Sequence, residues 1–196
     1  MITQKKEYFN NLAGEWEAHE FNETKIKHVL SMVPILPGDF VLDVGCGTGA
    51  LVSFLKGMVN PDGVIIEIDF AQEMLGKAKQ KYNFSNIYFI AADGETLPVI
   101  SKRFNHIICF ASFPHFENKE NTLKGFFRVL SPSGTLSIIH LMGSKELNIF
   151  HHKIGGPVEY DFLPQDDELR KLLTNAGFHT ISIRDEPELF FARAVK

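Results

Sequence analysis

A glycine-rich segment carries the clearest chemical signal in the chain. It reads VLDVGCGTG over residues 41–49. Its first four residues belong to the apolar run 40–44, which leads directly into the glycines. Glycine has no Cβ, so Gly45 and Gly47 would let the backbone approach a ligand closely. A helix that begins after the loop would offer free N–H groups to an anionic group. The segment therefore predicts a turn that holds a cofactor.

Two further acids stand where the next two apolar runs end. Asp69 closes the run 64–69, where its carboxylate can bind both hydroxyls of a ribose. Asp93 follows the run 87–91, with Gly94 directly after it. Open α/β sheets bind ligands beyond the carboxyl ends of their strands. We therefore expect these acids to lie at the same edge of a sheet as the glycine loop.

Two classes of cofactor fit this loop. Gly45-x-Gly47-x-x-Ala50, with Asp69 near the expected distance, also fits the dinucleotide pattern of a nicotinamide-dependent oxidoreductase. Asp43 decides between them, because a carboxylate there suits the ammonium group of an amino-acid moiety and would repel a pyrophosphate. A tight turn without a ligand is the structural alternative.

Histidines outside the loop could act on a substrate. His115 follows the run 106–111 and could serve as a general base near neutral pH, or it could be structural. His140 precedes the segment 142–165, which contains His151 and His152. Adjacent helical residues point about 100° apart, so this pair cannot easily share a metal, and we predict no metal site. One of the pair could equally be packed and the other solvated.

The order of apolar and amphipathic segments predicts the elements that position these residues. We expect strands at 40–44, 64–69, 87–91, 106–111 and 135–141, and helices at 48–58, 72–81, 121–130 and 166–175. Alternating strands and helices predict an α/β fold with a doubly wound, mostly parallel, Rossmann-like sheet. The last two strands, 178–183 and 189–194, are joined too closely for a crossover helix. They predict a C-terminal antiparallel hairpin on a sheet of seven strands.

Composition narrows the class of protein. The chain has 196 residues, 44% of them hydrophobic, and a net charge of −4. This favours one folded domain over a disordered chain, and it argues against a nucleic-acid partner. Cys46 and Cys109 have neither disulfide nor metal spacing. No apolar run is long enough to span a membrane, so we expect a soluble cytoplasmic protein without membrane insertion.

Four segments in this order resemble the class I S-adenosylmethionine-dependent methyltransferases. Residues 41–49 resemble the first motif of that family, and residues 68–75 its ribose-binding segment. Residues 92–98 are similar to the adenine-binding segment, and 126–136 to the helix and turn before the fifth strand. The nearest type is the small-molecule methyltransferase of ubiquinone and menaquinone biosynthesis.

The resemblance implies S-adenosylmethionine as cofactor and assigns roles to individual residues. Asp43 and the loop glycines would surround its methionine part, and the backbone of Ala111 would face the same part. Asp69 would hold the ribose, while Phe70 and Asp93 would contact the adenine. The implied cofactor-binding residues are Asp43, Gly45, Cys46, Gly47, Gly49, Asp69, Phe70, Met74, Asp93, Gly94 and Ala111.

The resemblance also implies an in-line methyl transfer to a small-molecule acceptor. Within a single domain, residues 1–33 would form a helical lid, 34–141 the cofactor-binding half, 142–165 an insert over the acceptor site, and 166–196 the last helix and hairpin. His115 is the candidate catalytic residue, and the candidate substrate-binding residues are Trp16, His140, His151 and His152. A cofactor-binding protein without turnover is the remaining alternative, and the oligomeric state stays open.

Overall fold

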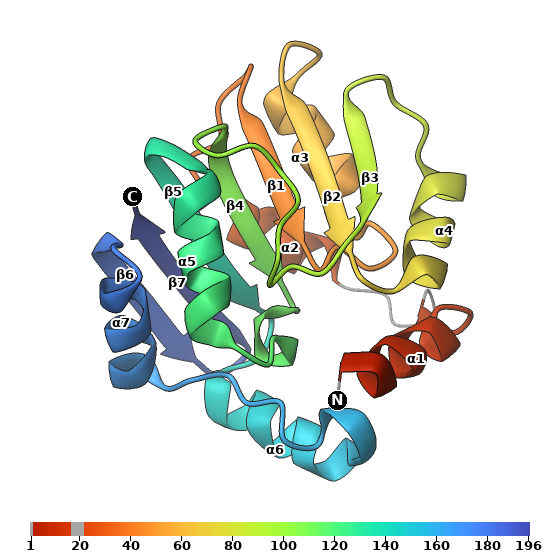
Figure 1. Cartoon of the computed structure of the whole chain (residues 1–196), viewed down its shortest axis with the longest axis vertical. Coiled ribbons are helices and arrows are strands. Elements are labelled where there is room, and N and C mark those ends of the chain that lie inside the picture. The colour runs from red at the N-terminus through yellow and green to blue at the C-terminus, as the bar shows by residue number, and fades with distance from the viewer. Residues whose placement is uncertain (1, 17–21) are drawn as a thin grey trace.

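The strands form one seven-stranded sheet in the order β3-β2-β1-β4-β5-β7-β6 (Figure 1). The computed structural model describes residues 2–16 and 22–196. Strands β1 to β5 pair in parallel, and β7 runs antiparallel to both β5 and β6. This confirms the predicted fold class and its C-terminal hairpin. The strands are β1 Phe40–Val44, β2 Val64–Asp69, β3 Ile87–Ala91, β4 Phe104–Phe110, β5 Leu130–His140, β6 His179–Glu186 and β7 Leu189–Val195.

Helices cover both faces of the sheet. Alternate residues of each strand point to opposite faces, so two apolar layers form. One layer contains Phe126 of α5 and Leu169 of α7, and the other contains Val29 of α2 and Leu55 of α3. The helices are α2 Glu23–Leu30, α3 Val52–Val59, α4 Gln72–Lys81, α5 Lys119–Val129 and α7 Asp166–Asn175.

The carboxyl ends of β1 to β4 meet at the lower edge of the sheet in Figure 1, and two segments lie over this edge. One is α1, Ile2–Leu12, and the other is α6, Ser144–Ile154, followed by the short helix η3, Gly156–Val158. Phe9 of α1 packs in one apolar cluster with Met74 of α4 and Val158 of η3. The regions predicted as lid and insert therefore meet over the ends of the strands.

The structure corrects the prediction at two boundaries. The helix predicted from Thr48 begins only at Val52, because Gly49 has φ +80°, which a right-handed helix does not accept. The segment 131–134, predicted as a turn, belongs to strand β5. It bulges out of the ladder, with Leu130 opposite Phe104 and Thr135 opposite His106.

Candidate active site

The glycine loop is held against the neighbouring strands by short contacts. The N–H of Gly45 donates to the carbonyl of Ile68 at 2.7 Å, and Oγ of Ser112 donates to the carbonyl of Val44 at 2.6 Å. Gly45 has φ +76°, and a Cβ there would lie 2.4 Å from Cβ of Ser112. Only glycine therefore fits this position.

The loop also fixes the carboxylate of Asp69. Its Oδ2 accepts from the N–H of Gly47 and its Oδ1 from the N–H of Ala71, both at 2.8 Å. An ionised carboxylate has about four acceptor sites, so two remain for a ligand. Burial raises the pKa of Asp69 to about 6, while the backbone donors oppose that rise. The group is therefore largely ionised at neutral pH and able to accept hydroxyl protons.

A cavity at this edge, the cofactor cavity, brings together most of the residues predicted to bind the cofactor. Asp43 and Cys46 are buried and do not line it, and Gly49 instead faces Tyr82. The residues that do line it are Gly45, Gly47, Asp69, Phe70, Met74, Asp93, Gly94 and Ala111. Prediction missed Ser112 and Phe116, which follow β4 and reach the cavity only through the chain turn after that strand.

The residues that line the cofactor cavity suit a cofactor with an adenosine and an amino-acid part. Gly47 has no side chain, so its backbone is open to the cavity. A Cβ added there would lie 3.8 Å from its nearest neighbour, Nε1 of Trp16. Asp69 and Asp93 stand at the ends of neighbouring strands, as hydroxyl and amino donors require.

Two buried acids lie side by side on β1 and β2, next to the glycine loop. Asp43 on β1 is the register partner of Glu67 on β2, and the two are 1% and 0% exposed. Burial raises the pKa of Asp43 to about 7, and burial together with the charge of Asp43 raises the pKa of Glu67 well above its usual value. The pair therefore retains a proton at neutral pH.

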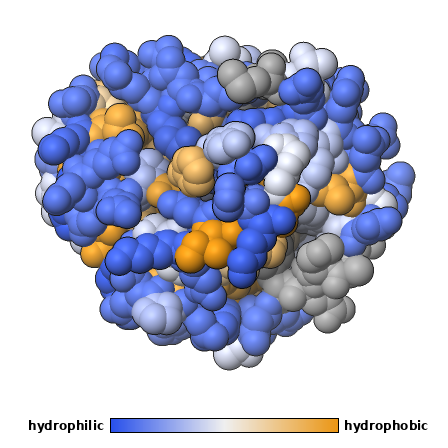
Figure 2. Space-filling view, turned by 90° about the horizontal axis from the view of Figure 1, so that it is seen from below, coloured by the Kyte–Doolittle hydropathy of each residue, from blue (hydrophilic) through white to orange (hydrophobic). Residues whose placement is uncertain are grey.

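A larger cavity, the acceptor cavity, adjoins the first and measures about 450 Å³. The two cavities share the residues Phe9, Trp16, Ala111 and His115. On the face that carries α6 and α1, apolar surface is exposed among hydrophilic residues (Figure 2). Phe150 of α6 lines the acceptor cavity and keeps 45% of its surface exposed there. Phe150 therefore adds apolar surface to a cavity that Glu15, Asn22 and Lys25 also line.

The predicted substrate-binding residues divide around this cavity. Trp16, His140 and His151 line it. His152 does not, because its side chain is 66% exposed, with Nδ1 3.6 Å from a carboxylate oxygen of Glu159. One histidine of the adjacent pair is thus packed and the other solvated. Within residues 2–16 and 22–196, no three His, Cys, Asp or Glu side chains are grouped to hold a metal ion.

Burial keeps His140 uncharged. Its side chain is 3% exposed, and desolvation lowers its pKa to about 3, with smaller contributions from His115 and His151. Among the described residues its Nε2 has no hydrogen-bond partner. His140 therefore presents a neutral polar atom in a cavity whose surface is mostly apolar.

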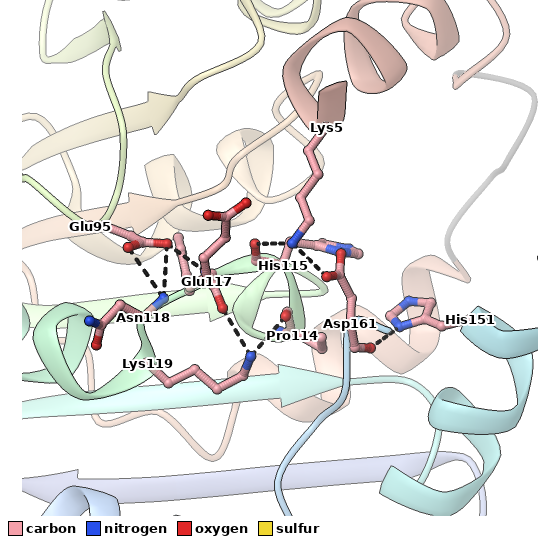
Figure 3. Close-up of polar contacts among 10 residues, drawn as sticks. Lys5, Glu95, Pro114, His115, Glu117, Asn118, Lys119, His151 and Asp161 are labelled. Carbon is pink, nitrogen blue, oxygen red and sulfur yellow. Dashed lines mark hydrogen bonds and ion pairs between the residues drawn. The ribbon is translucent and has the colours of Figure 1, made fainter. Parts of the chain in front are cut away.

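His115 lies in a network that joins three segments of the chain (Figure 3). Its Nδ1 is 2.8 Å from Oδ2 of Asp161, and Nζ of Lys5 is 2.6 Å from Oδ1 of the same carboxylate. Lys5 also donates to the carbonyl of His115 at 3.2 Å, and Nδ1 of His151 contacts the carbonyl of Asp161 at 2.5 Å. No pattern in the sequence predicts that residues 5, 115 and 161 meet.

Comparisons with known proteins agree with this geometry. The family described as "Methyltransferase domain" matches residues 41–134. The ubiquinone/menaquinone biosynthesis C-methyltransferase UbiE of Wigglesworthia glossinidia brevipalpis is 34% identical over 122 residues, 60% of this chain and 48% of that protein. The demethylmenaquinone methyltransferase of Staphylococcus epidermidis is 27% identical over 208 residues, 93% of this chain and 84% of that protein.

A solved structure shares the fold. The S-adenosylmethionine-dependent methyltransferase of Aquifex aeolicus superposes with a TM-score of 0.71 and 23% identity, covering 90% of this chain and 99% of that one. The sheet order, the glycine loop and these matches define a Rossmann-like methyltransferase. Residues 41–134 match the methyltransferase domain and both relatives are methyltransferases, so the comparisons support a methyltransferase enzyme that uses S-adenosylmethionine.

The comparisons do not support the nicotinamide-dependent oxidoreductase or the binding protein without turnover. The match to the first of the relatives spans about half of that protein's length. No helix in the described part of the chain is long and apolar enough to cross a membrane.

Proposed function

We propose that the protein transfers a methyl group from S-adenosylmethionine in the cofactor cavity to a small, mostly apolar acceptor in the adjoining cavity. The shared wall of the two cavities, formed by Phe9, Trp16, Ala111 and His115, carries this proposal. An in-line displacement requires donor and acceptor to meet at contact distance in a site that excludes water.

Different residues of the cofactor cavity would bind different parts of S-adenosylmethionine. The backbone at Gly45 and Gly47 would lie beside its methionine part, Asp69 would accept from its ribose, and Asp93 from its adenine. When bound, S-adenosylmethionine supplies an electrophilic methyl group on a sulfonium. Buried Asp43 would balance the positive charge from behind the loop.

The walls of the acceptor cavity favour a neutral acceptor. Leu147, Met142 and Val158 give it apolar surface, and His140 stays uncharged. A volume of about 450 Å³ lies within the range of small-molecule sites and suits a ring system with few polar groups. The name of one relative makes demethylmenaquinone the first acceptor to test, and its reduced form is the electron-rich one that an electrophilic methyl group requires.

We assign His115 the role of general base for an acceptor that must lose a proton, because the ring borders both cavities. We also place the reaction in the cytoplasm. The two cysteines are free and buried, as is usual in a reducing compartment.

Release of S-adenosylhomocysteine from purified protein, S-adenosylmethionine and reduced demethylmenaquinone tests the proposal. Leu147→Trp and Met142→Trp fill the acceptor cavity without touching the cofactor cavity. We expect both to lower kcat/KM for the acceptor at least tenfold and to leave the Kd for S-adenosylmethionine within twofold. Ile149→Trp, at an exposed position of helix α6, which also carries Leu147, is the matched control. Unchanged kcat/KM in both cavity variants would contradict the assignment of this cavity.

A further inference from the structure

We propose that Asp161 is a positioning residue, which fixes the tautomer and orientation of His115 and, through Lys5, makes this arrangement depend on docked helix α1. The inference rests on the proposed role of His115, and it adds a coupling between base and lid. It follows from the contacts of one carboxylate with two segments of the chain (Figure 3).

The carboxylate of Asp161 is placed to act on both partners at once. Oδ2 lies 2.8 Å from Nδ1 of His115, and Oδ1 lies 2.6 Å from Nζ of Lys5. The side chains of Lys5 and Asp161 are only 10% and 6% exposed. Because water is largely excluded, charge interactions in this cluster are stronger than on a protein surface.

An ionised carboxylate can only accept a hydrogen bond. Nδ1 of His115 must therefore carry the proton when the ring is neutral, which leaves the lone pair on Nε2. Among the described residues no hydrogen bond to this Nε2 is formed. The ring is also packed against two others, with Phe9 at 5.0 Å and His151 at 5.1 Å between ring centroids. The free lone pair is thus fixed at the wall between the two cavities.

The same geometry allows a balanced proton transfer. The acceptor's electron pair forms a bond to the methyl carbon, and the carbon–sulfur bond breaks with its electrons moving to sulfur. The acceptor's proton passes to Nε2 of His115, and the carboxylate of Asp161 stabilises the resulting imidazolium. The proton then leaves to solvent, so no other reactant is required.

Helix α1 completes this arrangement. Lys5 contacts both the carboxylate of Asp161 and the carbonyl of His115, and Phe9 of the same helix covers the imidazole. If α1 undocked, the carboxylate would lose its cation and the ring would lose its cover. His115 therefore has its full set of contacts only when helix α1, which lines both cavities, is docked.

The charged groups around His115 affect it in opposite directions. Burial lowers the pKa of His115, Asp161 raises it, and His151 and Lys5 lower it. His140 on β5 also faces the cluster but stays uncharged. Removing the carboxylate should thus lower the pKa of His115, while removing the ammonium of Lys5 should raise it. Loss of packing alone would not give shifts of opposite sign.

NMR of protein with ¹⁵N-labelled histidines and bound S-adenosylhomocysteine tests this without an acceptor. We expect His115 of the wild type to carry its proton on Nδ1. Asp161→Asn should lower its pKa and mix the tautomers, Lys5→Met should raise its pKa, and Glu159→Gln, the matched control, should change neither. A proton on Nε2 in the wild type, or shifts of one sign in both variants, would overturn the proposal. The wild-type tautomer decides even if Asp161→Asn does not fold.

Turnover of reduced demethylmenaquinone gives a second measurement. We expect kcat of Asp161→Asn to fall about 100-fold, the usual scale of general-base catalysis, with an unchanged Kd for S-adenosylmethionine. The acidic limb of the kcat–pH profile should move to lower pH in this variant and to higher pH in Lys5→Met. An unmoved limb together with wild-type kcat in Asp161→Asn would refute the role of Asp161. Wild-type protein that turns over no acceptor would count against the proposed function alone, since the NMR result stands independently.

Discussion

Asp43 and Glu67 lie opposite each other on the adjacent parallel strands β1 and β2, with both carboxyl groups buried in the sheet. No described donor reaches a carboxyl oxygen of Glu67 with hydrogen-bond geometry, although Asp43 and Cys46 lie close enough to shift its pKa. Their register neighbours on the flanking strands are Ile108 and Phe89, which are apolar. An unsatisfied carboxyl group in such surroundings opposes folding.

Replacing this carboxyl group should stabilise the fold. We expect Glu67→Leu to raise the free energy of unfolding at pH 8 by about 1–3 kcal/mol, the scale of one buried unsatisfied polar group. Chemical denaturation followed by circular dichroism measures this. Glu67→Gln, which keeps a buried polar group, should gain less. A lower stability of Glu67→Leu than of wild type would show that the carboxyl group has a stabilising partner in solution.

His140 makes the folded state sensitive to acid. Its pKa falls from 6.5 to about 3 on folding, so between these values the unfolded chain binds more protons than the folded one. The free energy of unfolding is therefore highest, as far as His140 is concerned, above pH 6.5. It decreases progressively as the pH falls toward 3. His140→Phe should reduce the loss of stability between pH 7 and pH 4.5 relative to wild type. Buried Asp43 acts in the opposite sense in this range, but it is common to both proteins. Identical pH profiles would rule out a buried neutral His140.

The glycine loop depends on the absence of one Cβ. Gly45→Ala would place a methyl group 2.4 Å from Cβ of Ser112 at φ +76°, so the loop must move. We expect the Kd for S-adenosylmethionine, measured by calorimetry, to rise at least tenfold. Gly57→Ala is the matched control, because an added Cβ there meets no atom within 4 Å. It lies inside helix α3 and should stabilise the protein by about 0.5–1 kcal/mol. Equal cofactor affinity in both variants would contradict the close packing at Gly45.

Trp16 should report cofactor binding. It is the only tryptophan in the chain, and it borders both cavities. Titration with S-adenosylhomocysteine should change its fluorescence intensity with the Kd found by calorimetry. Trp16→Phe should lose the signal and keep the fold. A flat titration alongside calorimetric binding would place Trp16 away from the bound cofactor.

The pattern of apolar runs predicted most of the fold. Strands buried on both faces appear as continuous apolar runs, and Gly45 and Gly47 mark where the chain must turn after β1. The loop, Asp69 and Asp93 could be predicted as one site because parallel strands bring their carboxyl ends to a common edge. The bulge at 131–134 could not, because it depends on pairing with β4.

The sequence by itself thus determined the sheet, the cofactor edge and the class of enzyme, since these follow from local periodicity and short motifs. Only the tertiary structure decided the other half of the site. Lys5, His115 and Asp161 meet across 110 and 46 positions of the chain, and a contact of such range leaves no local pattern. The same holds for His151 and His152, which differ only in which side of α6 faces the cavity. Packing of α1 and α6 over the sheet edge decided which polar groups lost their water, and therefore which of them could act on an acceptor.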